Sequence, residues 1–171
     1  MDSGELLVDA FDRVHGVVHR AVDGMTPEQL VFRPVDGTNS IAWLVWHLTR
    51  IQDDHVADAA GIDQAWTAGG WVERFGLPFD PGDTGYGHGA EDVSAVRVRS
   101  GELLTGYHDA VHRQTVQYVR SLNEGDLERI VDESWDPPVT LGVRLISVIS
   151  DDLQHAGQAS YVRGVGERGS F

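Results

Sequence analysis

The sequence contains neither cysteine nor lysine. All 13 basic residues in the 171-residue chain are arginines, and the cysteine count is zero. Without cysteine there are no disulfides, no protein thiol and no cysteine-ligated zinc, so any metal must be bound by His, Asp or Glu. Without lysine, Schiff-base and P-loop chemistry are excluded. Arginine in place of lysine also indicates a GC-rich coding genome.

Positive charge is scarce as well. The 27 acidic residues outnumber the arginines and give a formal net charge of −14. Because nucleic acids are bound largely by neutralising their phosphates, no nucleic-acid partner is expected. No apolar run approaches the roughly eighteen residues of a transmembrane helix. The acidic, amphipathic start of the chain is unlike a signal peptide. We therefore expect a cytoplasmic protein with no membrane partner.

Apolar residues recur at spacings of three and four in four segments of about twenty residues, as in amphipathic helices. The predicted helices cover residues 4–25, 40–60, 100–122 and 140–162. Gly61 is expected to end the second helix, and Gly164 and Gly166 the fourth. A short extra turn is expected at 26–30, and no segment predicts a convincing strand.

Residues 62–98 lack helical periodicity and are rich in glycine and proline. We predict a long, mostly irregular crossover between the second and third helices, and loops of this length tend to be functional. Its expected aromatic anchors are Trp66, Trp71, Phe75, Phe79 and Tyr86. The whole chain, residues 1–171, is thus predicted to be one all-α domain, a four-helix bundle with this long crossover.

Three polar side chains fall on the apolar faces of two predicted helices. His47 lies within the second helix, while Asp151 and His155 lie one turn apart on the last. A carboxylate directed at a bundle core is unfavourable unless it is paired or coordinates a metal. Two imidazoles and one carboxylate suit Zn²⁺ with an open position, as in catalytic sites. A core histidine with a simple ion pair is the alternative that this spacing leaves open.

Other histidines and one further carboxylate show related spacings. Two pairs are separated by four residues: His15 with His19, and His108 with His112. Both pairs fall beside the main apolar faces, which favours solvated or interface positions over metal ligation. Asp152 is expected either to orient one of the ligands through a hydrogen bond or to be solvated.

Two stretches resemble the DinB-like superfamily. Residues 39–48, NSIAWLVWHL, are similar to its second helix, which carries Trp and the first metal histidine. Residues 149–158, ISDDLQHAGQ, are similar to its last helix, where an acid or His precedes a His by four positions. The resemblance is greatest to the branch of mycothiol-dependent maleylpyruvate isomerase and related thiol S-transferases. The order of helices matches over nearly the whole chain.

The resemblance implies that His47, Asp151 and His155 bind Zn²⁺ or another divalent ion such as Ni²⁺. Position 151 departs from the family pattern, which usually has Glu or His there. The resemblance further implies an enzyme that activates a low-molecular-weight thiol, such as mycothiol, for S-transfer to an electrophilic substrate or for its isomerisation. The lysine-free composition fits an actinobacterial source, in which mycothiol would be that thiol. The resemblance also allows a homodimer built on helix faces.

A substrate pocket is expected between the second and fourth helices, under the 62–98 crossover. Trp43 and Trp46 are predicted to pack against the substrate, and Arg50 and Arg163 to hold a carboxylate. Core packing of the tryptophans and ion pairing of the arginines are the alternatives.

Two other functions stay open. A metal-assisted hydrolase would need no thiol. A non-enzymatic, metal-binding DinB-like protein of stress response or detoxification would close its metal with a fourth protein ligand, Asp152 or His55. A di-iron bundle is disfavoured, because the chain lacks the two Glu-x-x-His motifs and the further glutamates that such a centre requires.

Overall fold

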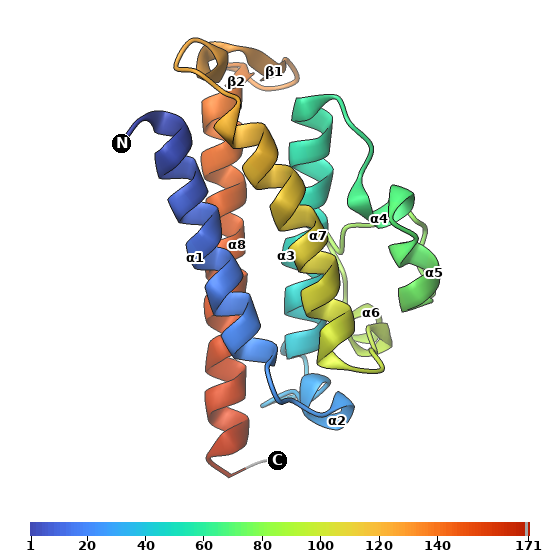
Figure 1. Ribbon diagram of the computed structural model, residues 1–171. Helices are drawn as coiled ribbons and strands as arrows, with labels where there is room; N and C mark the ends of the chain where they lie inside the picture. The colour runs from blue at the N-terminus through green and yellow to red at the C-terminus, as the bar shows by residue number, and fades with distance from the viewer. Residues whose placement is uncertain (170) are drawn as a thin grey trace.

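Four long helices form a bundle (Figure 1). The computed structural model describes residues 1–169 and 171. The long helices are α1 (Ser3–Val22), α3 (Ile41–Ala60), α7 (Gly101–Arg120) and α8 (Leu141–Glu167). Both α1 and α3 pack mainly against α7 and α8, so α1 and α3 lie diagonally opposite each other. The predicted all-α four-helix bundle is therefore confirmed.

Side chains at the helix ends satisfy backbone groups that the helices leave free. Ser40 caps α3 by accepting a hydrogen bond from the backbone N–H of Trp43, and Thr140 caps α8 through Val143. Gly61 ends α3 with a φ of 66°, in the left-handed region that glycine adopts without a steric penalty. The second helix thus begins and ends where its sequence predicts.

The connections contain shorter elements. The expected extra turn is α2 (Pro27–Leu30). The crossover is more helical than predicted, with three short helices: α4 (Ala65–Ala68), α5 (Trp71–Phe75) and α6 (Ala90–Ala95). A 3-10 helix (Asp126–Glu128) precedes an antiparallel pair, β1 (Ile130–Asp132) and β2 (Val139–Thr140). These strands escaped prediction because two or three residues show no periodicity.

The last helix is longer than predicted, because neither Gly164 nor Gly166 ends it, and Gly166 serves packing instead. α8 continues to Glu167, past both Gly164 and Gly166. A Cβ atom on Gly166 would lie 2.3 Å from Cε1 of Phe171, so the ring packs directly on the helix backbone. A glycine near a helix end therefore has two uses that the sequence alone does not separate.

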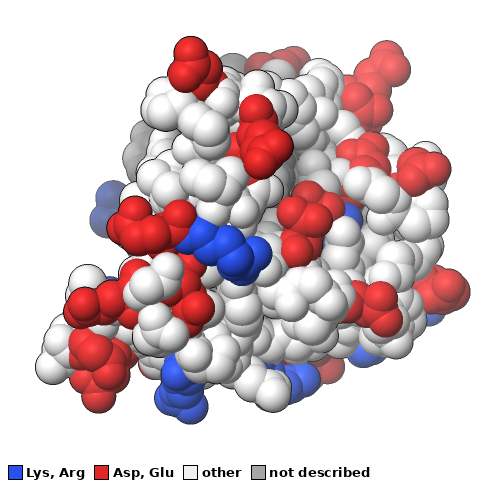
Figure 2. All heavy atoms as spheres, turned by 90° about the horizontal axis from the view of Figure 1, so that it is seen from above, with Lys and Arg blue, Asp and Glu red and all other residues white. Residues whose placement is uncertain are grey.

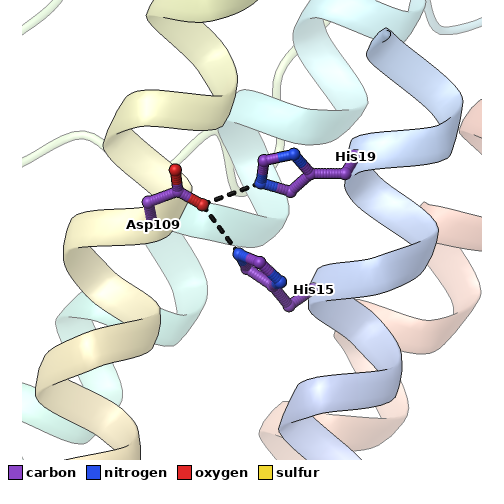
Figure 3. Close-up of side chains that lie close together, drawn as sticks. All are labelled: His15, His19 and Asp109. Carbon is purple, nitrogen blue, oxygen red and sulfur yellow. Dashed lines mark hydrogen bonds and ion pairs between the residues drawn. The ribbon is translucent and has the colours of Figure 1, made fainter.

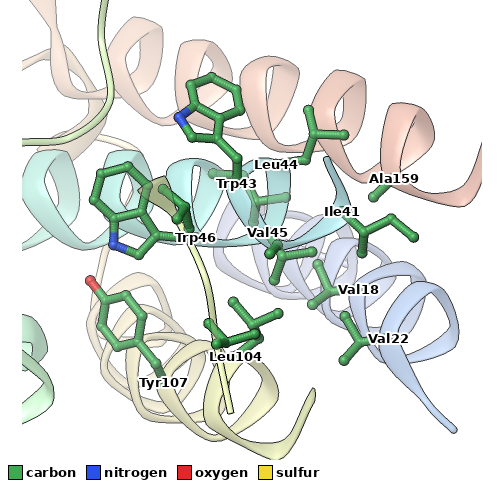
Figure 4. Packing of buried hydrophobic residues seen from close by; sticks show 14 of the residues in the cluster. Val18, Val22, Ile41, Trp43, Leu44, Val45, Trp46, Leu104, Tyr107 and Ala159 are labelled. Carbon is green, nitrogen blue, oxygen red and sulfur yellow. The ribbon is translucent and has the colours of Figure 1, made fainter. Parts of the chain in front are cut away.

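Buried apolar side chains from all four long helices form the core. The larger of two clusters contains residues of all four long helices and of the crossover, and Figure 4 shows part of it. Its labelled residues are Val18, Val22, Ile41, Trp43, Leu44, Val45, Trp46, Leu104, Tyr107 and Ala159. Each fully buried large apolar side chain contributes about 1.5–3 kcal/mol. Of the predicted crossover anchors, Trp66, Trp71 and Phe75 are buried, whereas Tyr86 is 90% exposed and anchors nothing.

A buried carboxylate ties the crossover to the bundle. Asp53 of α3 is 2% exposed and accepts hydrogen bonds from the backbone N–H groups of Ala65 (2.9 Å) and Trp66 (2.8 Å) at the start of α4. It also accepts from the hydroxyl of Tyr107 on α7 (2.8 Å). Burial raises the pKa of Asp53, and these donors and the charge of Arg50 oppose that rise. One side chain thus joins α3, α4 and α7.

Arg50 completes this network. It is fully buried, with its guanidinium 3.6 Å from the Asp53 carboxylate. It donates to the hydroxyl of Tyr107 (3.2 Å) and, through Nε, to the backbone carbonyl of Asp83 (3.1 Å). The structure thus pairs the charge of Arg50, predicted to hold a substrate carboxylate, with Asp53 and closes it off from solvent.

Among the charged side chains, acidic ones prevail on the surface seen from the end of the bundle that carries β1 and β2 (Figure 2). Arginines interrupt them at few places in this view. Within the described part of the chain, no helix is both long and apolar enough to cross a bilayer.

Replacing Asp53 by Asn should destabilise the protein by roughly 3 kcal/mol, because Arg50 would lose its buried counter-charge and an amide N–H₂ would face a backbone donor. Urea unfolding followed by circular dichroism measures this change. The matched control is Asp54→Asn, since Asp54 is partly exposed, accepts a hydrogen bond from Gln64 (2.8 Å) and lies 3.8 Å from His55. Its expected cost is about 0.5 kcal/mol or less. Equal costs for the two variants would contradict an anchoring role for Asp53.

His108 of α7 is fully buried as a neutral ring. Thr49 donates its hydroxyl to the carbonyl of Val45 (2.7 Å), so Nδ1–H of His108 donates to Thr49 Oγ1 (3.2 Å). Its Nε2 atom has no partner among the described residues. Burial, assisted by the neighbouring rings of His15 and His112, lowers the pKa of His108 to about 3.

This lowered pKa predicts loss of stability in acid. Between about 3 and the ordinary 6.5, the unfolded chain binds a proton at His108 that the folded chain does not. The free energy of unfolding is therefore unaffected by this group above pH 6.5 and falls as the pH drops below it. From pH 8 to pH 5 the loss should be about 2 kcal/mol. His108→Asn keeps a donor near the position of Nδ1 and should show a fall smaller by that amount in urea titrations. Parallel pH profiles for the two proteins would show that His108 is protonated in the folded state.

Candidate metal centre

The seam between α3 and α8 brings the three predicted ligands together. His47 is buried on α3, whereas Asp151 and His155 are partly exposed on α8. One ligand atom from each residue lies within 4.8 Å of the other two. Nε2 of His155 is 3.5 Å from Oδ1 of Asp151, and the two imidazole rings have centroids 4.9 Å apart. Residues separated by more than a hundred positions thus face one small volume.

The crossover fixes the ring of His47. Nδ1 lies 2.5 Å from the backbone carbonyl oxygen of Thr84. A carbonyl oxygen only accepts, so Nδ1 carries the hydrogen and Nε2 keeps its lone pair. The indole of Trp43 stacks on the same ring, with centroids 4.6 Å apart and planes 16° from parallel. Such contacts orient a ligating histidine and select its tautomer.

Trp43 is in turn held by His88, a residue whose sequence context of glycines gave no functional signal. The indole N–H of Trp43 donates to Nδ1 of His88 (3.1 Å), and Nε2–H of His88 donates to the carboxylate of Asp83 (3.0 Å). Contacts from Asp83 to His88, from His88 to Trp43 and from Trp43 to His47 therefore make the position of the His47 ring depend on the position of the crossover.

His155 is oriented from within its own helix. Its Nδ1 lies 3.0 Å from Oε1 of Gln158, an acceptor, so Nε2 is the nitrogen that faces Asp151. Gln158 has no predicted role, although it lies within the 149–158 stretch and three residues after His155. That spacing places the two side chains on one helix face and is the signal that identifies it.

The three ligands shift one another's proton affinities. Burial lowers the pKa of His47, so this imidazole is neutral. Burial alone would raise the pKa of Asp151, but the hydrogen bond and charge of His155 outweigh it, and the pKa is lowered. The Asp151 hydrogen bond raises the pKa of His155. A neutral imidazole and an ionised carboxylate are the forms that bind a cation, so the raised pKa of His155 favours a proton in competition with a metal ion at this ring.

The donor set fits a divalent ion of the zinc type. Oδ2 of Asp151 is buried and has no hydrogen-bond partner among residues 1–169 and 171. Together with the imidazole nitrogens it gives the N,N,O set that Zn²⁺ and Ni²⁺ accept. His55 does not join the set, because its Nδ1 accepts from Arg144 (2.9 Å). Three protein ligands leave a coordination position for a small molecule.

Asp152 lies deeper than expected. It is fully buried, and neither carboxylate oxygen has a hydrogen-bond partner in the described part of the chain. Burial and the adjacent charge of Asp151 raise the pKa of Asp152 well above the usual value. The expectation that Asp152 orients a ligand through a hydrogen bond therefore finds no contact to support it.

The other predicted substrate residues are already engaged within the protein. Trp46 is 1% exposed and packs against Trp66 and Phe79 in the core. Arg163 donates to the backbone carbonyls of Arg20 and Asp23, each at 2.7 Å, and so caps the end of α1. Of the four predicted substrate residues, Trp43 contacts the metal ligands. The aromatic pocket expected under the crossover is filled by the crossover's own side chains.

The remaining histidine pairs lie elsewhere, between α1 and α7. His15, His19, His108 and His112 form one cluster there, with ring centroids of neighbouring pairs 4.4–6.5 Å apart. His15 and His19 are partly exposed, as expected, but His108 is fully buried rather than solvated.

The protein is thus a four-helix bundle with two histidines and one carboxylate that could hold a metal ion between two helices. The family model described as DinB superfamily matches residues 10–159, and the chain belongs to this superfamily, which includes enzymes. A crystal structure of the conserved protein of locus from Enterococcus faecalis is 31% identical and has a TM-score of 0.90. The match covers 96% of this chain and 97% of that one. No curated protein matches the chain.

Gly85 places the crossover against the metal centre and provides a test of this geometry. Its φ is 87°, and an added Cβ would lie 2.9 Å from both Nδ1 of His47 and Cζ3 of Trp46. Gly85→Ala should therefore displace His47 and weaken Zn²⁺ binding by about tenfold or more in competition with a chelating dye. Gly87→Ala is the matched control, because Gly87 has a φ of 78° and no atom within 4 Å of the added Cβ. Equal Zn²⁺ affinities in the two variants would show that the crossover does not position the ligand.

Proposed function

We propose that this protein is a metal-dependent enzyme that activates a low-molecular-weight thiol for attack on an electrophilic small molecule. The observation that carries the proposal is the His47, Asp151 and His155 set, with its oriented imidazoles and a position left for a further ligand. A divalent ion bound there supplies Lewis-acid chemistry, favouring the deprotonated form of a coordinated thiol at neutral pH. Zn²⁺ is the ion that we propose, with Ni²⁺ next.

The residues of the chain prepare this site in three ways. The donor set carries one negative charge, on Asp151, so a divalent ion keeps a net positive charge that favours an anionic thiolate. Thr84 and Trp43 hold His47 in place before any ligand binds. The partial exposure of Asp151 and His155 leaves one side of the set accessible to a small molecule. Preorganised charge of this kind lowers barriers without reorganisation during reaction.

The thiol must come from a cosubstrate, because the chain has no cysteine. A thiolate can displace a leaving group, so that a carbon–sulfur bond forms as the bond to the leaving group breaks. Alternatively it adds to an activated alkene and is expelled after bond rotation, which isomerises the alkene. Mycothiol is the first thiol to test, since the arginine-only composition fits an actinobacterial source. Such thiols are kept reduced in the cytoplasm, where we place the activity.

The first experiment measures metal bound to protein purified without a histidine tag. We expect His155→Ala to bind one equivalent of Zn²⁺ or Ni²⁺ less than the native protein, by mass spectrometry of the metal. Gln154→Ala is the control, because this exposed side chain is bonded only within its own helical turn, to Ser150. Circular dichroism confirms that both variants are folded. Equal metal content in native protein and His155→Ala would remove the basis of the proposal.

Turnover is then measured with mycothiol and electrophiles that include an activated alkene such as maleylpyruvate. We expect product formation to require both metal and thiol, and to fall about a hundredfold or more in His155→Ala. Turnover that is unaffected by omitting the thiol would identify a metal-assisted hydrolase instead. Bound metal without turnover of any electrophile would favour the non-enzymatic, metal-binding role in stress or detoxification.

A further inference from the structure

A second group of metal-ligating side chains lies on the opposite seam of the bundle, between α1 and α7 (Figure 3). His15 and His19 project from successive turns of α1 toward Asp109 on α7. The Nε2 atoms of both rings lie 2.7 Å from the same carboxylate oxygen, Oδ1 of Asp109. One ligand atom from each of the three residues lies within 4.8 Å of the other two.

The convergence on a single oxygen is informative. A carboxylate has two oxygens and about four acceptor positions, so two imidazole N–H groups bound only by hydrogen bonding have room on separate oxygens. Here both rings converge on the same oxygen instead, so three atoms able to bind a metal lie close together. Two histidines four residues apart on one helix face form a chelating pair, and a carboxylate from a facing helix adds the third donor.

The surroundings hold this group in place. The ring of His112 stacks on His15, with centroids 4.4 Å apart, and its Nε2 is bound to Asp12 at 2.9 Å. His112 therefore supports His15 from the side and does not belong to the donor set. The fully buried ring of His108 is 5.7 Å from His15, and its Nε2 has no partner among the residues that the structure describes.

We propose that His15, His19 and Asp109 form a second metal site, which takes a borderline first-row divalent ion such as Zn²⁺, Ni²⁺ or Cu²⁺ and clamps α1 to α7. Imidazole nitrogen with one carboxylate is the donor chemistry that these ions favour over Mg²⁺ or Ca²⁺. To bind a metal through Nε2, each ring must give up the hydrogen on Nε2, and exchange with water can return a hydrogen to Nδ1. The rings are 31% and 40% exposed, which permits this exchange. Hollows beside His112 and beside His19 give solvent access at both ends of the cluster.

The experiment counts metal ions per chain in the full-length, untagged protein. The metal is first removed with a chelator, and the protein is then equilibrated with Zn²⁺ alone and separated from free ion. We expect two equivalents in the native protein, one in His19→Ala, one in His155→Ala and none in the double variant. Asp109→Asn, which preserves the shape of the side chain, should also retain one. Asp9→Asn is its charge-matched control, since Asp9 pairs with Arg13 on the exposed side of α1 and should leave two equivalents.

A second measurement tests the clamp directly and does not depend on activity. In the His155→Ala background, added Zn²⁺ should raise the Tm because the ion binds the folded chain at the α1–α7 seam. Adding Asp109→Asn to that background should abolish the rise. The native protein could instead bind one equivalent, which His155→Ala removes and His19→Ala leaves in place. This result would overturn the second site but not the α3–α8 centre. The reverse pattern would overturn the α3–α8 centre and support the second site.

Discussion

The position of the crossover depends on burying the Asp53 carboxylate together with its partners. Removing a carboxylate from water is unfavourable by several kcal/mol unless charge and hydrogen bonds replace its hydration. Asp53 receives two backbone N–H groups, the Tyr107 hydroxyl and the nearby charge of Arg50. These contacts require α3, α4 and α7 to lie in this arrangement, which gives the following segment a fixed starting point. Arg50 then reaches onward to the carbonyl of Asp83, the residue next to Thr84.

The geometry of the candidate metal centre depends on this Asp53 network. Once Asp83 is held, Thr84 presents its carbonyl to His47, and the Asp83 carboxylate holds His88 against Trp43. The backbone then passes so close to His47 and Trp46 that Gly85 has no room for a side chain. The glycine-rich composition that made this segment look irregular is therefore a packing requirement at one position, and the ligand geometry follows from contacts made more than thirty residues away in sequence.

This dependence explains which features the sequence predicts. The bundle and the inward position of His47 follow from the spacing of apolar residues within each helix, so the local sequence predicts them. The ligand pair Asp151 and His155 is also local, one turn apart. Arg50 lies on the same helix, yet its role depends on Tyr107 and Asp83, which periodicity does not bring near it. The sequence likewise showed His15 and His19 on one face of α1, but only the packing of α1 on α7 shows that Asp109 faces them.

The two seams also differ in what an ion would meet there. At the α3–α8 seam His47 is buried, and both imidazoles are oriented by partners outside the donor set, Thr84 and Gln158. At the α1–α7 seam both imidazoles hydrogen-bond to the third donor itself, and all three side chains are about one-third exposed or more than that. Ligands held by contacts outside the donor set keep their geometry when one small molecule replaces another at the ion's open position. Catalysis requires such an exchange. Ligands that hold one another are instead suited to joining two helices, and α1 is the helix that gains most, since it lies diagonally across the bundle from α3 and takes no part in the buried Asp53 network.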